Sequence, residues 1–355
     1  VYKRQGLMSK NPKKRHKGFS SAAVVMIALA LAGAAFAAPA FLTANGYLVP
    51  DDLRISYMSP DGISSYAGRD PAAAYNSNRS EYLVVWIGND NILSTGETEV
   101  WGQRVHASTG ALIGEQIQIS QMVPDRDSDN SVKDPQVAYN LTRDEFLVVW
   151  QGNDYYFGFR EDFEIWGQRL DYKGGKLVEK GEDFKISQMG PPPPSTEAAY
   201  YIALEPAIAY NNNPEVDEYL VVWHGDDQAS GLAENEFEIF GQRLGYSEAD
   251  GLVETGRDDF RISYMGPSNN EDFGASSPDV AYNSNRNEYL VVWWGDTTSS
   301  GLVRGEHEIW GKRVNWDDSP AGPQQRISDM GVDGIKNYGA YDPAAAYNPD
   351  SDQYL

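Results

Sequence analysis

The chain has 355 residues and a formal net charge of −23. A strongly acidic body repels phosphate backbones, which argues against a nucleic-acid partner. The sequence contains no cysteine, so disulfides, thiolate metal sites and cysteine nucleophiles are excluded. A chain of this length can bury a large core without such cross-links.

The first forty residues differ from the rest in composition. Residues 1–7 are interpreted as lying upstream of the natural start at Met8, and they are left out of the fold reasoning. A basic stretch at 10–17 precedes an apolar stretch at 22–38, which contains the small-x-small pattern Ala35-Phe36-Ala37. This order predicts a cleavable signal peptide.

The predicted signal peptide covers residues 8–37, and residues 38–52 are interpreted as a linker. An uncleaved membrane anchor is the alternative, although the apolar stretch is short and rich in alanine for a spanning helix. We therefore expect export to the extracellular space or the cell surface, with the periplasm also open. No membrane span is expected to remain after cleavage, and we expect a monomer.

Four phrases recur in a fixed order along the remainder of the chain. The first reads Asx-Pro-x-x-Ala-Tyr-Asn or a close variant, and occurs at 70–76, 134–140, 205–211, 277–283 and 342–348. The second ends in Leu-Val-Val-Trp, at 83–86, 147–150, 220–223 and 290–293. The third resembles Glu-Ile-Trp-Gly-Gln-Arg, at 99–104, 164–169, 238–243 and 308–313. The fourth contains Ile-Ser, at 117–122, 184–189, 260–265 and 325–330.

Each phrase is short, rich in β-branched and aromatic residues, and bounded by Gly, Pro, Asn or Asp, which predicts four strands per repeat. We name them a, b, c and d in chain order. The repeats run over 70–122, 134–189, 205–265 and 277–330, with a partial one at 342–355. A single d-type strand at 53–58 precedes them.

Strand b decides the architecture. Tyr82, Val84 and Trp86 point to one face and Leu83 and Val85 to the other, so both faces are apolar and both must be covered. Strand d is apolar on one face only, and strand a is rich in alanine. This pattern predicts an all-β protein, a β-propeller of four-stranded antiparallel blades.

The partial repeat stops inside its strand b, and the isolated d-type strand at 53–58 lies at the other end. We therefore expect a C-terminally truncated propeller that completes one blade from both termini, with six to eight blades in the full ring. A row of small β-sandwich modules is the main alternative, and an open β-solenoid is another.

The Leu-Val-Val-Trp and Ile-Trp-Gly-Gln-Arg phrases resemble those of uncharacterised secreted or surface repeat proteins of bacteria. The resemblance covers residues 53–355. It implies an extracellular, propeller-like repeat and no assigned activity.

Residues that recur in every repeat are expected to serve the fold. The third phrase carries an arginine and strand b begins with a glutamate, and we expect these to pair or to cap carbonyls between blades. The arginines are Arg104, Arg169, Arg243 and Arg313, and the glutamates are Glu81, Glu145, Glu218 and Glu288.

Function is expected where the repeats differ, in the long b-to-c and d-to-a loops that share one face of a propeller. Aromatic and imidazole groups in these loops are candidates for binding a ligand: Tyr155, Tyr156, Phe159, His224 and Trp294. Carboxylates that follow the loop glycines are candidates for Ca²⁺: Asp90, Asp154, Asp226, Asp227 and Asp296. The spacing of these carboxylates is also that of ordinary Gly-Asx turns.

The leading interpretation is an exported, non-enzymatic scaffold that binds a glycan, a protein or another ligand through this face. The alternative is a carbohydrate-active enzyme, a glycosidase or lyase, with an acid–base pair drawn from Asp154, Glu161, Asp162, Asp226 and Asp227. A passive cell-surface spacer is a third possibility. Apart from Ca²⁺, no cofactor is expected.

Overall fold

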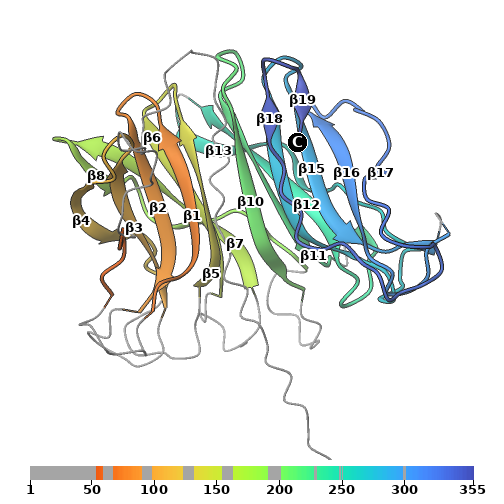
Figure 1. The fold of residues 1–355 in the computed structure, drawn as a ribbon. Helices are drawn as coiled ribbons and strands as arrows, with labels where there is room; N and C mark the ends of the chain where they lie inside the picture. The colour runs from red at the N-terminus through yellow and green to blue at the C-terminus, as the bar shows by residue number, and fades with distance from the viewer. Residues whose placement is uncertain are drawn as a thin grey trace, which may run out of the picture.

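A computed structural model describes residues 53–58, 67–89, 98–122, 132–153, 163–190, 201–227, 230–247, 249, 251–298 and 301–355. These residues form a β-propeller, as the sequence predicts, and the sheets follow one another around a common centre (Figure 1). The predicted signal peptide and linker lie outside the described residues. Among the residues described, no helix is both long and apolar enough to cross a membrane.

Four blades contain strands a to d, and a fifth contains two strands. Blade 1 consists of β1 (Arg69–Asn76), β2 (Glu81–Gly88), β3 (Glu99–His106) and β4 (Leu112–Gln118). Blade 2 consists of β5 (Val132–Asn140), β6 (Glu145–Asn153), β7 (Phe163–Lys173), β8 (Lys176–Glu179) and β9 (Phe184–Lys185). Blade 3 consists of β10 (Ala203–Asn211), β11 (Glu218–Gly225), β12 (Glu238–Ser247) and β13 (Gly251–Arg261). Blade 4 consists of β14 (Ala275–Asn283), β15 (Glu288–Gly295), β16 (Glu308–Asn315) and β17 (Gln325–Arg326), and blade 5 of β18 (Tyr347–Asn348) and β19 (Gln353–Tyr354).

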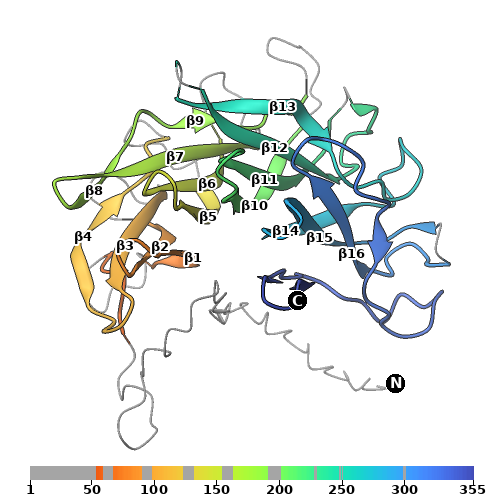
Figure 2. The ribbon, with the colours of Figure 1, turned by 90° about the horizontal axis from the view of Figure 1, so that it is seen from above.

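Within each blade every strand pairs antiparallel with the next along the chain. In blade 2 the outermost position is divided between β8 and β9, which both pair with β7. The alanine-rich strands β1, β5, β10 and β14 lie nearest the centre when the ring is seen from above (Figure 2). Their small side chains suit the place where neighbouring blades converge.

The two faces of strand b pack against different blades, as its pattern predicts. In β6, Phe146, Val148 and Trp150 belong to the core shared with blade 1, which also contains Leu83 and Val85. The alternating residues Leu147 and Val149 belong to the core shared with blade 3. All nine residues of β6 are buried. Each fully buried aliphatic side chain stabilises the fold by about 1.5–3 kcal/mol, so the inter-blade cores are the main source of stability.

Only the first two residues of each predicted strand d pair with strand c, and in blades 1 and 3 the observed strand begins before the predicted phrase. Only residues 184–185 of the predicted strand 184–189 pair with strand c. The next two residues leave the ladder because the amides of Ile186 and Ser187 both approach the same carbonyl oxygen, that of Ile165, at 2.7 and 3.3 Å. Ser187 then caps the Ile165 amide through its hydroxyl at 2.8 Å. Residues 53–58 form no regular strand either.

Candidate functional site

The first phrase of each repeat places one polar side chain at the start of the innermost strand, directly before a proline. These positions are Asp70, Asp134, Glu205, Ser277 and Asp342. Strand a begins and strand b ends at the same end of the blade, so these side chains lie on the face that carries the b-to-c and d-to-a loops. We call them the axial residues.

The backbone at the axial residues has an unusual conformation. All five have φ between 49° and 51°, a left-handed conformation that side chains other than glycine rarely adopt. In blade 2 the pairing of β5 with β6 skips Asp134 and Pro135, because proline has no N–H to donate to the ladder. Such a bulge re-aims a side chain, and the conformation costs on the order of 1–3 kcal/mol at each site.

Three axial carboxylates on neighbouring blades interact electrostatically. Burial, together with the negative charges of Glu205 and then Asp70, raises the pKa of Asp134 to about 6 against the opposing charge of Lys133. A carboxyl group with this pKa is partly protonated close to neutral pH. Asp134 can therefore donate a proton, which an ordinary aspartate cannot do there.

Hydrogen bonds fix Glu205 beside Asp134. The Ser277 hydroxyl donates to Glu205 Oε2 at 2.7 Å, and Trp294 Nε1 donates to the Ser277 oxygen at 3.0 Å. His224 Nδ1 lies 3.5 Å from the same Glu205 oxygen. Burial lowers the pKa of His224 although Glu205 opposes this, so the imidazole is neutral near pH 7. The Glu205 side chain remains 45% exposed, so it can reach a ligand.

A cluster of three rings continues outward from Trp294. The ring centroids of Trp294 and His307 are 4.7 Å apart, and Tyr341 lies 5.2 Å from Trp294 and 5.3 Å from His307. The Tyr341 hydroxyl lies 3.1 Å from His307 Nδ1, which orients both rings. Tyr341 is 53% exposed. An exposed aromatic face next to carboxylates is suited to stacking on a sugar ring.

Two of the predicted ligand-binding residues, His224 and Trp294, are brought together around Glu205 and Ser277. The other three, Tyr155, Tyr156 and Phe159, lie outside the described residues. The role of all five in binding a ligand stays a prediction.

The predicted metal ligands are placed separately. Asp226 accepts hydrogen bonds from the amides of Ile202 and Asn235 at 2.9 and 2.7 Å, and Asp296 accepts one from the Gly305 amide at 2.6 Å. Asp227 accepts the Ser230 hydroxyl at 2.8 Å. These three carboxylates stabilise the loop backbone by accepting hydrogen bonds.

Asp90 and Asp154, the remaining predicted metal ligands, lie outside the described residues, as do Glu161 and Asp162 of the predicted acid–base set. Within the described ranges, no group of three or more His, Asp or Glu residues is arranged to hold a metal ion. Binding of Ca²⁺ by these loops stays a prediction.

Sequence reasoning missed the axial carboxylates because it assigned the Asp-Pro phrase to the start of a structural strand. The signal was present: an acidic residue precedes the proline in four of five repeats, and the fifth has serine. Repeats 64 to 72 residues apart bring these residues to one place only when the ring geometry is known.

A separate cavity of about 310 Å³ lies between blades 3 and 4, at the opposite end of the strands. Its lining includes Glu218, Arg243, Tyr246 and Trp316. Its lining also includes Glu215 and Val216 of the a-to-b link of blade 3. This link has Pro214 where the links of blades 1, 2 and 4 carry arginine.

No model of a known protein family matches the sequence, and no curated protein matches it. Solved structures do match. A Hadza microbial sialidase is 10% identical with a TM-score of 0.41, over 69% of this chain and 44% of the sialidase. An N-acetylgalactosamine deacetylase from F. plautii, in complex with blood group B trisaccharide, is 14% identical with a TM-score of 0.46, over 83% and 79% of the two chains. A family 117 glycoside hydrolase from the marine bacterium Zobellia galactanivorans is 8% identical with a TM-score of 0.44, over 83% and 76%.

The chain spans less than half the length of the sialidase. At these identities the likeness shows the fold alone. The matched structures are carbohydrate-active enzymes, whereas the leading interpretation of the sequence was a non-enzymatic scaffold. That interpretation is therefore not kept, and the enzyme that the sequence left as the alternative is taken up under the proposed function. The chemistry of this chain has to be argued from its own residues.

Proposed function

We propose that the chain is a carbohydrate-active enzyme that hydrolyses glycosidic bonds at the axial residues. The observation that carries the proposal is the placing of Asp70, Asp134 and Glu205 on three neighbouring innermost strands, with the pKa of the middle residue raised to about 6. Glycoside hydrolysis needs two carboxyl groups in opposite protonation states on either side of the scissile bond.

Asp134 is the proton donor in this proposal. Its proton passes to the glycosidic oxygen as the bond to the anomeric carbon breaks. A water molecule supplies the new C–O bond, and Glu205 accepts the proton that this water loses. Asp70 stays close enough to raise the pKa of Asp134. Each turnover consumes one water and releases two free sugar ends.

The neighbours of Glu205 are positioning residues. Ser277 and His224 orient its carboxylate without touching the substrate's reacting atoms. The rings of Trp294 and Tyr341 offer a stacking face for a sugar next to the bond that breaks.

The test separates the two roles by the leaving group. Asp134→Asn keeps a side chain that tolerates positive φ, so the change removes the acid and leaves the backbone conformation accessible. We expect a roughly 10²–10⁴-fold loss of kcat on unactivated glycans. Aryl glycosides with a strongly acidic phenol need no protonation, so the same variant should retain their cleavage.

Glu205→Gln should lose activity on both kinds of substrate, because water activation is needed for each. Glu115→Gln is the matched control, since Glu115 is an exposed carboxylate on the outermost strand β4. Equal losses in the control and the axial variants would refute the assignment. Export of the enzyme, predicted from residues 8–37, is part of the proposal and is tested by the N-terminal sequence of the secreted protein.

A further inference from the structure

Neighbouring blades are joined by a recurrent polar contact at the end opposite the axial residues. An asparagine that ends strand a donates to the residue that precedes strand b of the next blade. Asn76 Nδ2 lies 3.1 Å from Asp144 Oδ1, and Asn140 Nδ2 lies 3.0 Å from Asp217 Oδ1. We call the accepting residue the receiver. Receivers have φ between 48° and 53°, so they share one geometry.

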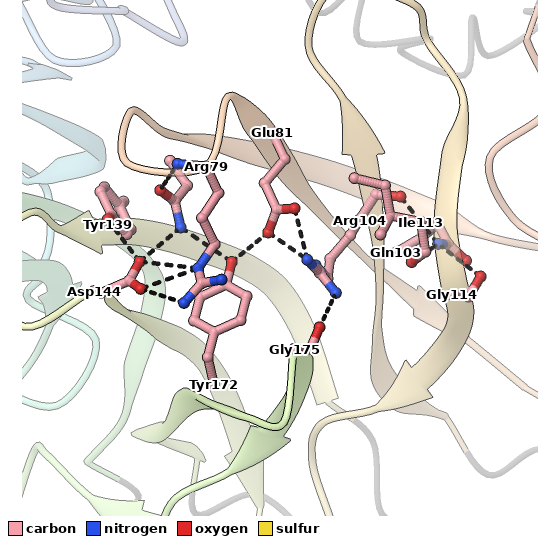
Figure 3. A network of polar contacts seen from close by, with 11 residues as sticks. Arg79, Glu81, Gln103, Arg104, Ile113, Gly114, Tyr139, Asp144, Tyr172 and Gly175 are labelled. Atoms are coloured by element: carbon pink, nitrogen blue, oxygen red, sulfur yellow. Dashed lines mark hydrogen bonds and ion pairs between the residues drawn. The ribbon is translucent and has the colours of Figure 1, made fainter.

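An arginine in the a-to-b link adds charge to this contact. Arg79 Nη2 donates to Asp144 Oδ2 at 2.6 Å, and the guanidinium lies 3.6 Å from the centre of the Tyr172 ring (Figure 3). Arg143 contacts Asp217 at 2.8 Å and lies 3.6 Å from the Tyr246 ring. Between blades 4 and 5, Arg286 contacts Asp352 at 2.8 Å.

The link and the receiver are also complementary at the remaining observed interface, between blades 3 and 4. The link of blade 3 carries Pro214 and has no arginine. Its receiver in blade 4 is the neutral Asn287, which accepts from Asn211 at 2.8 Å. A carboxylate without its cation would be costly in this half-buried place, so a link without an arginine requires a neutral receiver.

Blade 1 carries a receiver to which no asparagine of another blade donates within the described residues. Ser80 has φ 52°, like the other receivers, and it is exposed. Tyr75, beside it on β1, is 45% exposed, whereas the equivalent Tyr139 is half-buried under a neighbouring blade. Where blades 2 and 3 have Tyr172 and Tyr246 to stack on an arginine, blade 1 has Ala107. This face therefore fits a blade whose link has no arginine.

Blade 5 has such a link. Its residues 348–352 place Ser351 at the arginine position. A second position is also complementary: Asn78 and Asn285 donate to the carbonyls of Leu141 and Pro349 at 3.2 and 2.8 Å. In blades 5 and 1 the two roles are exchanged. Blade 5 has Asp350, an acceptor, where blades 1 and 4 have the donating asparagine, and blade 1 has Ser77, whose hydroxyl can donate, at the accepting position.

The segment 53–58 already occupies the outer place of a preceding blade. Gln116 exchanges two hydrogen bonds with the backbone of Tyr57 at 3.0 and 3.2 Å. Between blades 3 and 4, Gln324 does the same with Tyr264, at 2.9 and 2.9 Å. Trp86 Nε1 also donates to Met58 Sδ at 3.3 Å. Residues 53–58 therefore contact blade 1 in the same way as the strand d segment of blade 3 contacts blade 4.

We propose that blade 5 packs directly against blade 1 and closes a five-bladed ring, with residues 53–58 as the outer segment of the fifth blade. Seen from above, blade 5 ends the series on the side where blade 1 begins it (Figure 2). The closure goes beyond the proposed function. It makes the axial residue Asp342 the neighbour of Asp70, so it predicts that the five axial side chains form a closed ring.

Thiol cross-linking tests the closure directly, because the chain has no cysteine of its own. Ser80→Cys and Asn348→Cys place the only two thiols where receiver and donor should meet. A short bis-maleimide should join them within one chain, with a yield close to that of the control pair N76C and D144C at an observed interface. The pair S80C and N211C should not react. A covalent dimer would show that a second copy covers blade 1, and no cross-link would show that blade 5 does not; both results overturn the proposal.

A charge cycle gives an independent measurement that does not depend on cross-linker reach. Ser351→Arg and Ser80→Asp together recreate the pair found at three other interfaces. The melting temperature of the double variant should exceed the sum of the changes in the two single variants. This coupling between the two positions should be within about twofold of the coupling measured for Arg143→Ser with Asp217→Ser. Additive shifts would refute the contact. Both serines are exposed surface residues, so the variants should fold.

Discussion

Glu145 is a fully buried carboxylate at an inter-blade contact, and its removal has a predictable cost. Its side chain is fully buried and pairs with Arg169 at 2.9 Å and with Lys180 at 3.1 Å. It also accepts the hydroxyl of Tyr246 from the next blade. Glu145→Gln keeps the shape and removes the charge.

The magnitude follows from what each partner can do afterwards. Arg169 is only 14% exposed and cannot turn to water, whereas Lys180 is 41% exposed and can. Breaking a buried ion pair by removing one partner costs about 3–5 kcal/mol. We therefore expect Glu145→Gln to lower the free energy of unfolding by about 3 kcal/mol, with little contribution from Lys180.

The same position in blade 4 is the matched control. Glu288 is 3.4 Å from Arg313, which is 46% exposed and free to rehydrate. Glu288→Gln should cost no more than about 1 kcal/mol, as for an exposed ion pair. Urea denaturation followed by tryptophan fluorescence gives both values, provided that the m-value is unchanged. Equal costs for the two variants would refute the reasoning, because burial would then not decide the cost.

Three further predictions concern the axial site, a blade contact and a close backbone approach. The pKa of Asp134 is raised to about 6 in the folded protein. Its stabilising contribution is therefore complete below the pKa that Asp134 has in the unfolded chain, and it is lost as the pH rises through 6. The free energy of unfolding should fall by on the order of 1–3 kcal/mol between pH 4 and 7, relative to Asp134→Asn. A slope identical in both proteins would contradict this. Asn287→Asp places a carboxylate opposite the link of blade 3, which has no arginine, and should lower the melting temperature. Asp144→Asn should lower it only through the loss of the ion pair with Arg79. A raised melting temperature for Asn287→Asp would contradict the complementarity of link and receiver. Gly295→Ala brings a Cβ within 2.4 Å of the Gly274 carbonyl oxygen and should lower the free energy of unfolding by about 1–3 kcal/mol. Gly152→Ala should lower it less, because its Cβ meets the flexible end of Met122 at 3.1 Å. Thermal melts of the two variants compare the two costs.

The fold could be predicted because its determinants are local and repeated. The alternation of Phe146, Leu147, Val148 and Val149 assigns each side chain to one of two neighbouring blades, and the core clusters confirm it. The expected pairing of Arg104 with Glu81 is also observed, at 2.7 Å, but across two strands of one blade. The contact between blades is made by the same arginine, which donates to the Gly175 carbonyl at 3.0 Å (Figure 3).

The prediction of strand d was less accurate because β-propensity does not show whether a residue finds a hydrogen-bonding partner in the sheet. Phe184-Lys185-Ile186-Ser187 alternates like a strand, yet the serine hydroxyl takes the amide that a ladder would use. Tertiary hydrogen bonding therefore decides where this strand ends.

The site could not be predicted because it is made by residues far apart in the chain. Asp134 gains its raised pKa from burial and from Glu205 and Asp70, on two other blades. The sequence showed an Asp-Pro dipeptide that recurs like a structural residue. Long loops with carboxylates such as Asp226 looked more promising, but that side chain serves two backbone amides.

Release of sugars is the measurement that tests the enzyme assignment most directly. The full-length protein is incubated with a panel of neutral, acidic and amino-sugar polysaccharides, and new chain ends are quantified by chromatography. The account predicts turnover of at least one glycan by the wild-type protein at pH 5–6, reduced at least about 100-fold in Asp134→Asn and unchanged in Glu115→Gln. Turnover that survives intact in Asp134→Asn, or its absence with every glycan, would contradict the axial residues as a catalytic site.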